Sequence, residues 1–341
     1  MLPTPRESVL LLSALLLTAA VYGLWTPDIP RAELQQRYGV PGQQVMAVDG
    51  LHIHYQDSGP PEAPALLLLH GFGSSLQTWN AWAPELAAQY RVIRLDLPGF
   101  GLTGASPTRD YSEARDVATL TQVLDRLGVT RLAVVGHSLG GKMAWSLAAA
   151  QPARVQALVL MAPDGYAPPA QWGSQPYAMP SVMGVMKYSL PKPLVRQAVS
   201  AAFSDPQWLT EPLVDRYHAM LRAPGVRAAI LDRGDQTFYA NPIARLQKIT
   251  APTLLLWGED DRMIPSSHAA SYAQVLPQSQ TVVLPHLGHV LQEEQPELGL
   301  AQVRAFLHQH MPPVSRSTQV AAISAQIENS PVRVLGLGEW R

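Results

Sequence analysis

From residue 65 onward, short apolar runs alternate with helical stretches, and this alternation limits the possible folds more than any other feature of the 341-residue chain. The run 65–69 is apolar at every position, as expected for a strand that is buried on both faces. Repeated strand–helix units predict an α/β fold with a parallel sheet and right-handed crossovers. We expect strands at 65–69, 91–95, 131–135, 155–161, 253–257 and 281–284, and helices at 79–89, 112–127, 140–150, 267–275 and 296–309.

Other segments interrupt or flank this alternation. A hairpin with strands at 43–48 and 51–57 is predicted around Asp49-Gly50, a favoured two-residue turn. The sequence therefore predicts one core, interrupted by an insertion whose apolar runs are typical of helices. The expected units are a connector at 26–42 with a short helix at 31–38, a core at 43–164 and 250–311, a helical insertion at 165–249 with helices at 182–188, 194–203, 211–221 and 226–237, and a poorly ordered tail at 312–341.

Composition excludes several classes of function. The chain has 25 Lys and Arg against 26 Asp and Glu, which leaves no basic excess for a nucleic-acid partner. It contains no cysteine, so disulfides, thiolate metal sites and a cysteine nucleophile are all excluded. Because no cluster with metal-ligand spacing and no phosphate-binding loop is visible, we expect neither a metal nor a cofactor.

The N-terminus carries an uncharged apolar run at 9–25. Its length is near the lower limit for a membrane-spanning helix, and Tyr22 and Trp25 at its far end suit a membrane interface. Three interpretations compete: an uncleaved anchor, a signal peptide cleaved near Thr18-Ala19-Ala20, and a soluble helix. We expect residues 1–25 to anchor the protein in a membrane, with the folded part outside the cytoplasm. Secretion or a periplasmic location after cleavage is the alternative.

The motif Gly-His-Ser-Leu-Gly at 136–140 lies between an expected strand and an expected helix. Glycines on both sides of Ser138 suit a sharp, strained turn that exposes the serine hydroxyl at a helix N-terminus. The helix dipole favours the negative charge that develops there during acyl transfer. Ser138 is therefore the candidate nucleophile.

A serine hydroxyl needs a base, and His289 is the best candidate among ten histidines. It follows the expected strand 281–284, which places it in a loop at the carboxyl edge of the sheet. The nearest alternative base is His286, three residues earlier. The acid should follow the strand 253–257. Glu259, Asp260 and Asp261 all lie within reach, and the chain order serine, acid, histidine fits a triad of this type.

Two further loops follow the first two buried strands. We expect the backbone N–H of Phe72, in the loop 70–73, to pair with that of Leu139 as an oxyanion hole. Asp96 begins the loop 96–101, and we interpret it as a structural carboxylate that braces the loops near the site.

Together these loops resemble the landmarks of the α/β-hydrolase family, and the resemblance covers about residues 45–310. It implies a mostly parallel central sheet flanked by helices, with the insertion 165–249 as a cap over the pocket. The family register G-x-x-D-x-x-[VI]-P selects Asp261 as the acid. The landmarks are the loops at 70–73, 96–101, 136–141, 258–265 and 288–289.

The resemblance also narrows the chemistry. Ser138 argues against the haloalkane dehalogenase and epoxide hydrolase branches, which use aspartate there. Trp257-Gly258 is similar to the carbon–carbon bond hydrolases of aromatic ring cleavage, but residues 72–75 depart from their pattern. The extended N-terminus resembles that of membrane-anchored bacterial members.

We therefore expect a serine esterase that cleaves small apolar carboxylic esters through an acyl-enzyme. The alternatives are carbon–carbon bond hydrolysis, a cofactor-free haloperoxidase-like activity, and a non-catalytic binding protein on the same fold.

Overall fold

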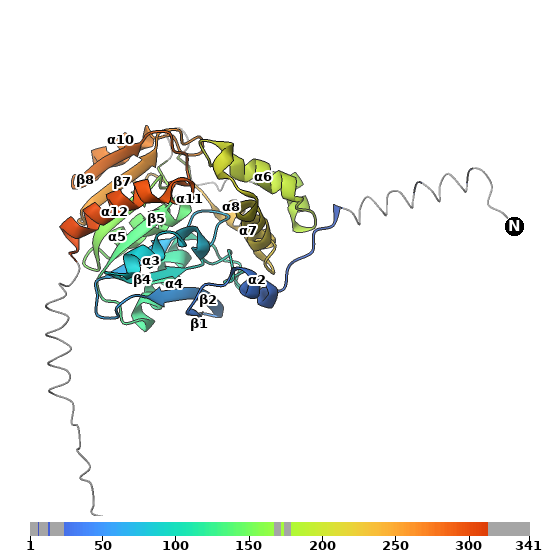
Figure 1. Ribbon diagram of the computed structural model, residues 1–341, viewed down its shortest axis with the longest axis horizontal. Helices are drawn as coiled ribbons and strands as arrows, with labels where there is room; N and C mark the ends of the chain where they lie inside the picture. The colour runs from blue at the N-terminus through green and yellow to red at the C-terminus, as the bar shows by residue number, and fades with distance from the viewer. Residues whose placement is uncertain (1–5, 7–12, 14–23, 167–171, 174–178, 313–341) are drawn as a thin grey trace, which may run out of the picture.

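The computed structural model of the chain describes residues 6, 13, 24–166, 172, 173 and 179–312. Its centre is an eight-stranded sheet in the order β1-β2-β4-β3-β5-β6-β7-β8 (Figure 1). The pairs β1–β2 and β2–β4 are antiparallel and the other pairs are parallel, so the predicted mostly parallel sheet is confirmed. The strands are β1 (Gln43–Val48), β2 (Leu51–Ser58), β3 (Ala65–Leu69), β4 (Arg91–Leu95), β5 (Leu132–His137), β6 (Val155–Met161), β7 (Thr253–Gly258) and β8 (Ser279–Leu284).

Side chains of the central strands alternate between two hydrophobic cores, one on each face of the sheet. Leu67 and Leu69 of β3 belong to the core on the α4 and α5 side, whereas Leu66 and Leu68 belong to the core on the α3 and α12 side. Because both faces are covered, every residue of β3 is buried. The covering helices are α3 (Ala83–Ala87), α4 (Glu113–Arg126), α5 (Leu139–Ala150), α10 (His268–Val275), α11 (Leu291–Glu294) and α12 (Pro296–His310), and α2 (Arg31–Tyr38) precedes the sheet.

One predicted helix, 79–89, is wrong in its extent. The structure has a short 3₁₀ helix, η1 (Leu76–Trp79), followed by the five-residue α3. Pro84 lies at the start of α3, where its missing N–H costs no helical hydrogen bond. A continuous helix through Pro84 would lose such a bond, so the segment folds as two shorter pieces.

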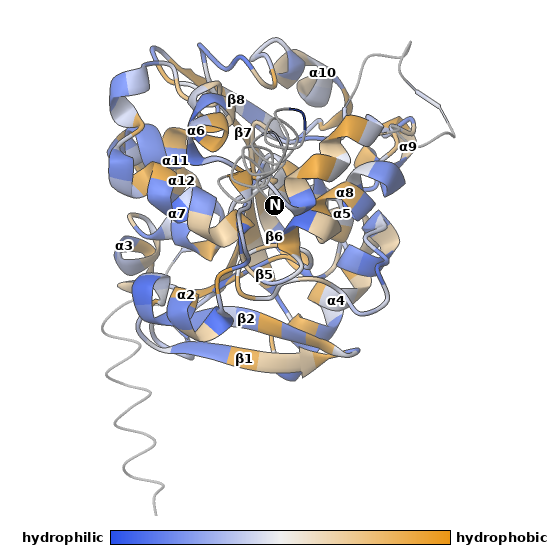
Figure 2. Ribbon diagram, turned by 90° about the vertical axis from the view of Figure 1, so that its right-hand side faces the viewer, coloured by the Kyte–Doolittle hydropathy of each residue, from blue (hydrophilic) through white to orange (hydrophobic). Residues whose placement is uncertain are grey.

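The helical insertion lies between β6 and β7. Figure 2 shows α6, α7, α8 and α9 arranged around β5, β6 and β7. The run predicted as a helix at 182–188 is a 3₁₀ helix, and the helix predicted at 194–203 begins and ends earlier. The elements are η3 (Ser181–Lys187), α6 (Lys192–Ser200), η4 (Pro206–Trp208), α7 (Glu211–Leu221), α8 (Val226–Gln236) and α9 (Ile243–Leu246).

The predictions for the two ends of the chain lie almost wholly outside the described residues. Of the apolar run 9–25, the structure describes residues 13, 24 and 25, and of the tail 312–341 it describes residue 312. Within the described part of the chain, no helix is both long and apolar enough to cross a membrane.

Candidate active site

Ser138 occupies a strained turn between β5 and α5. Its backbone has φ 52° and ψ −118°, a region that residues with a Cβ rarely adopt. Three backbone hydrogen bonds hold this conformation: Ser138 N–H donates to the Met161 carbonyl at 2.9 Å, and the Ser138 carbonyl accepts from the N–H groups of Lys142 and Asp164 at 3.0 Å. A Cβ at Gly140 would lie 2.3 Å from the Leu69 carbonyl oxygen, so only glycine fits beside the turn.

Asp261 and His289 meet at the carboxyl edge of the sheet. Asp261 Oδ2 lies 2.7 Å from His289 Nδ1, and both side chains are buried. Asp261 Oδ1 accepts hydrogen bonds from the backbone N–H groups of Met263 at 2.8 Å and Ile264 at 2.9 Å. The carboxylate is therefore fixed on both oxygens, while the neighbouring Asp260 is exposed.

His137 connects the serine turn to the histidine loop. Its Nε2 lies 2.9 Å from the His289 carbonyl oxygen, and the two imidazole rings are 4.6 Å apart. Burial, reinforced by the proximity of His289, lowers the pKa of His137 well below its ordinary value, which disfavours the charged form of this ring. Among the described residues no hydrogen bond joins Ser138 Oγ to His289 Nε2, and that nitrogen has no protein partner. The rival His286 is exposed.

The loop after β3 lies directly against the serine. A Cβ at Gly71 would be 3.2 Å from Ser138 Cβ. Phe72 is half exposed, and its ring packs edge-on against Phe100 with the centroids 5.4 Å apart. The N–H groups of Phe72 and Leu139 donate to no acceptor in the described part of the chain. Both donors are therefore available to a ligand.

Asp96 is a second buried carboxylate at this edge, and sequence reasoning missed its main partner. Its Oδ2 lies 2.8 Å from His54 Nδ1 and accepts from the Leu102 N–H at 2.7 Å, and its Oδ1 accepts from the Leu76 N–H at 2.7 Å. Burial alone would raise the pKa of Asp96, but the hydrogen bond and charge of His54, together with the charge of His70 and the Leu76 N–H, hold the pKa below its ordinary value. The contacts agree with the bracing role predicted for Asp96; nothing in the sequence pattern pointed to His54.

The insertion holds the histidine loop in place, which sequence reasoning also missed. The His289 N–H donates to the Ala202 carbonyl at 2.7 Å. Glu294, which is buried, accepts from the Gly288 N–H at 2.7 Å and from the Ser204 N–H at 2.9 Å. One carboxylate therefore joins the loop before His289 to the segment that follows α6.

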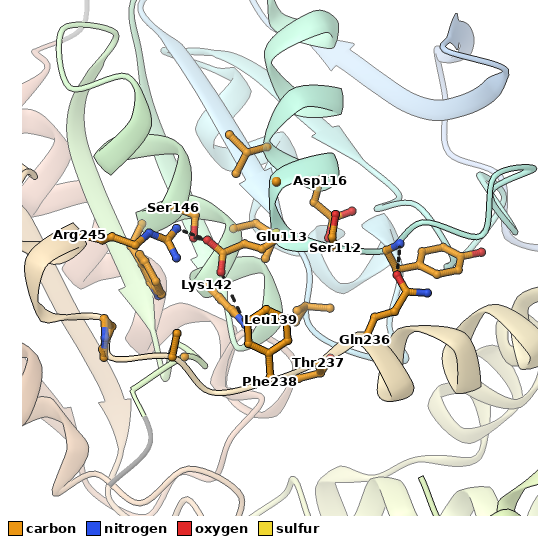
Figure 3. A pocket seen from close by; sticks show the side chains of 18 of the residues that line it. Ser112, Glu113, Asp116, Leu139, Lys142, Ser146, Gln236, Thr237, Phe238 and Arg245 are labelled. Carbon is orange, nitrogen blue, oxygen red and sulfur yellow. Dashed lines mark hydrogen bonds and ion pairs between the residues drawn. The ribbon is translucent and has the colours of Figure 1, made fainter. Parts of the chain in front are cut away.

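A cavity of about 550 Å³ lies beside the serine turn, between α4, α5, α8 and α9. It adjoins the site through Leu139; neither Ser138 nor His289 lines it. Figure 3 shows Lys142 and Arg245 converging on Glu113, with Phe238 beside Lys142. Burial would raise the pKa of Glu113, but hydrogen bonds from Arg245 and Ser146 and the charge of Lys142 keep it low. The lining thus combines apolar side chains with the charged cluster around Glu113 and with the ion pair between Asp116 and Arg233.

The described residues contain no group of three or more His, Asp or Glu side chains that could hold a metal ion. A serine turn, a buried aspartate–histidine pair and two free backbone donors at one sheet edge are the arrangement required for nucleophilic acyl transfer.

Comparison with known proteins places this arrangement in a family. The family model described as the alpha/beta hydrolase fold matches residues 64–296. The chain therefore belongs to the α/β-hydrolase fold family. It is a hydrolase, and its relatives act on different bonds.

Two curated relatives illustrate this range. The chain is 30% identical to the 2-hydroxy-6-oxononadienedioate/2-hydroxy-6-oxononatrienedioate hydrolase of Burkholderia vietnamiensis strain G4, over 75% of this chain and 91% of that protein. It is 29% identical to epoxide hydrolase 3 of Xenopus tropicalis, over 83% of this chain and 82% of that protein.

A solved structure covers more of the chain. It is described as a membrane phospholipase A and a bacterial virulence factor, and it matches with a TM-score of 0.68 and 28% identity. The match covers 89% of this chain and 98% of that one.

Proposed function

We propose that this protein is a serine esterase that cleaves apolar carboxylic esters, with Ser138 as nucleophile, His289 as general base and Asp261 as the orienting acid. The observation that carries the proposal is the 2.7 Å contact between Asp261 and His289 beside the strained Ser138 turn. Because Asp261 fixes Nδ1 of the imidazole, Nε2 is left to exchange a proton with substrate and serine.

In the proposed reaction, Ser138 Oγ attacks the ester carbonyl while His289 Nε2 takes its proton. The backbone N–H groups of Phe72 and Leu139 stabilise the oxyanion of the tetrahedral intermediate. His289 then returns the proton to the leaving alcohol, and an acyl-serine remains. Water attacks the acyl-serine with His289 again as base, which releases the carboxylic acid and restores the hydroxyl. Asp261 stabilises the imidazolium in both steps.

Two observations favour esters. The match to a membrane phospholipase A covers the largest share of this chain among the comparisons above, and that description names an enzyme of acyl esters. Ser138 stands where an epoxide hydrolase of this fold would carry aspartate. Carbon–carbon bond hydrolysis is the second candidate, because the 30% identical Burkholderia relative is named as the hydrolase of a 2-hydroxy-6-oxo-dienedioate and the same triad type would serve such a reaction.

The arrangement of the insertion supports a further part of the proposal, that residues 165–249 form a cap over the substrate. Residues of α8 and α9 and the segment between them, such as Phe238 and Arg245, wall the cavity opposite α4 and α5. We propose that this cavity receives the part of the substrate beyond the scissile bond.

The N-terminal run 9–25 supports the proposal that the protein is attached to a membrane. Its lack of charge and its interfacial aromatic residues suit a single membrane anchor with the hydrolase on the extracytoplasmic side. Membrane fractionation of the full-length protein tests this: recovery in the soluble fraction with Met1 still present would overturn the anchor.

Fluorophosphonate labelling together with turnover of p-nitrophenyl esters of graded chain length tests the activity. The protein should become labelled and should hydrolyse esters, and Ser138→Ala should abolish labelling and lower turnover by about 10⁶-fold. A 2-hydroxy-6-oxo-dienoate substrate should be a poor one. Rapid carbon–carbon cleavage without ester turnover would select the second candidate, and near-normal ester turnover by Ser138→Ala would overturn the mechanism.

A further inference from the structure

The insertion carries a concentration of exposed apolar side chains on η3 and the start of α6. Val182 is 71% exposed, Val185 58%, Tyr188 59% and Leu194 57%, and Met183 is 42% exposed. We call these five residues the η3 patch. Apolar side chains that gather on one surface, rather than being scattered singly, mark a site of interaction.

The η3 patch is continuous with the point where the apolar N-terminal run ends. The ring of Trp25 stacks on that of Tyr188 with the centroids 6.0 Å apart. The Thr26 N–H donates to the Tyr188 carbonyl at 2.9 Å, and Thr26 Oγ1 accepts from the Leu190 N–H at 2.9 Å. Leu24 and Trp25 are themselves more than half exposed. The last residue of the apolar run, Trp25, and the residue that follows it, Thr26, therefore contact the patch.

Charge and aromatic content match a lipid interface. The segment 179–204 contains no Asp or Glu. Its Lys187 is exposed and forms no ion pair with any described residue, whereas Lys192 pairs with Glu211 and Asp215 on α7. A lysine can extend its ammonium group to lipid headgroups while its stem covers apolar surface, and Trp and Tyr rings are favoured at the headgroup level.

We infer that the η3 patch docks on a lipid bilayer and inserts its apolar side chains among the headgroups and upper acyl chains. The inference rests on the proposed membrane attachment of residues 9–25, because an anchor that ends at Trp25 brings the patch to the bilayer surface. Lys187 contributes attraction to anionic headgroups. The insertion would then lie against the membrane, as an interfacial surface with an apolar face does.

The absence of cysteine in the chain allows a clean test. Val182→Cys in the full-length protein is labelled with an environment-sensitive fluorophore and mixed with vesicles of phosphatidylglycerol and phosphatidylethanolamine. Val283→Cys is the matched control, because Val283 is an exposed valine on β8, which lies at the opposite side of Figure 1 from α6. The emission at position 182 should shift to the blue and be quenched by nitroxide-labelled lipids, while the emission at position 283 stays constant.

Each other result overturns the proposal. An unchanged spectrum at position 182 would show that the patch stays in water. A blue-shifted spectrum before vesicles are added would show that the chain itself covers the patch, and a shift that grows with protein concentration without lipid would show a second copy. Lys187→Glu should reduce the response with anionic vesicles and leave it unchanged with phosphatidylcholine alone.

Hydrolysis of a water-soluble p-nitrophenyl ester is measured on every variant. Activity with no response at position 182 would overturn the docking surface alone, and a response without activity would overturn the esterase alone.

Discussion

The protein contains two buried histidine–aspartate pairs, whose carboxylates follow β4 and β7, and the pairs differ in the bonding of one imidazole nitrogen. His54 and Asp96 are 2.8 Å apart, and His289 and Asp261 are 2.7 Å apart. In both pairs the carboxylate follows a buried strand and accepts two backbone N–H groups. The imidazole of His54 is bonded on both sides, because its Nε2 lies 3.0 Å from Gln43 Oε1. The Nε2 of His289 has no partner among the described residues.

The comparison teaches that burial and a short aspartate contact do not by themselves identify a catalytic histidine. A ring bonded at both nitrogens joins two strands and a loop, whereas a ring with one free nitrogen beside a strained serine can transfer a proton. We therefore expect changes to the Asp261 pair to act on turnover and changes to the Asp96 pair to act on stability.

The largest expected effect comes from Asp261→Asn, which should lower kcat by about 10⁴-fold, because the amide favours the wrong imidazole tautomer. Asp260→Asn is the matched control; its side chain is exposed, and kcat should change by less than about tenfold. Steady-state kinetics with a soluble ester measures both. If the two effects came out reversed, the role of orienting acid would be reassigned from Asp261 to Asp260.

Asp96→Asn should act on folding instead. Replacing the Asp96 carboxylate leaves the His54 side chain buried without its charged partner. The free energy of unfolding should therefore fall by about 3 kcal/mol. Urea denaturation followed by circular dichroism measures this. The kcat per labelled active site should stay within about threefold of the parent, since surviving folded molecules keep the triad in place. A loss of kcat as large as that of Asp261→Asn would contradict the assignment of the Asp96 pair to stability and of the Asp261 pair to turnover.

Glu294→Gln should give a smaller effect on turnover. Glu294 ties the Gly288 N–H to Ser204, so its replacement loosens the position of His289 without removing a reacting group. We expect kcat to fall by about tenfold with KM nearly unchanged, because small displacements of a catalytic group are costly. Glu297→Gln, at the exposed start of α12, is the control for loss of charge. Equal effects of Glu294→Gln and Glu297→Gln on kcat would contradict the proposed role of Glu294 in positioning His289.

The smallest effect is on acid stability. The pKa of Asp96 is lower in the folded state than its unfolded value of about 3.9. Its stabilising contribution is therefore complete above the unfolded pKa and is lost as pH falls through the folded pKa. Asp96→Asn should flatten the dependence of unfolding free energy on pH below about pH 4. An unaltered slope there would contradict the assignment of this carboxylate as a stabilising anion.

Sequence could predict the elements whose pattern is local. The strands 65–69, 91–95 and 155–161 have the predicted bounds, because each is a short run dominated by apolar residues between turn residues. The turn at Ser138 was also predictable, since glycines between a strand and a helix leave few alternatives. Whether Ser138, His289 and Asp261 play their predicted roles stays a prediction that the kinetics above will test.

Contacts between distant segments could not be predicted. His54 is 42 residues from Asp96 in the chain, and its role depends on the pairing of β2 with β4, which periodicity does not reveal. The contact of Ala202 with the His289 N–H depends on how a helical insertion packs against the core. Such packing is fixed by the complementary shapes of many side chains, and no local pattern encodes it.

The Ala202 contact limits how this enzyme can be re-engineered. A Cβ at Gly288 would lie 2.6 Å from the Ala202 carbonyl oxygen. The insertion and the histidine loop are therefore packed too closely at this junction for a side chain at position 288. A chimaera that receives a foreign insertion would need a carbonyl at the same place, or the imidazole would lose its backbone anchor. Substrate range could then be exchanged between relatives only by grafts that leave the segment from Ala202 to Ser204 in place.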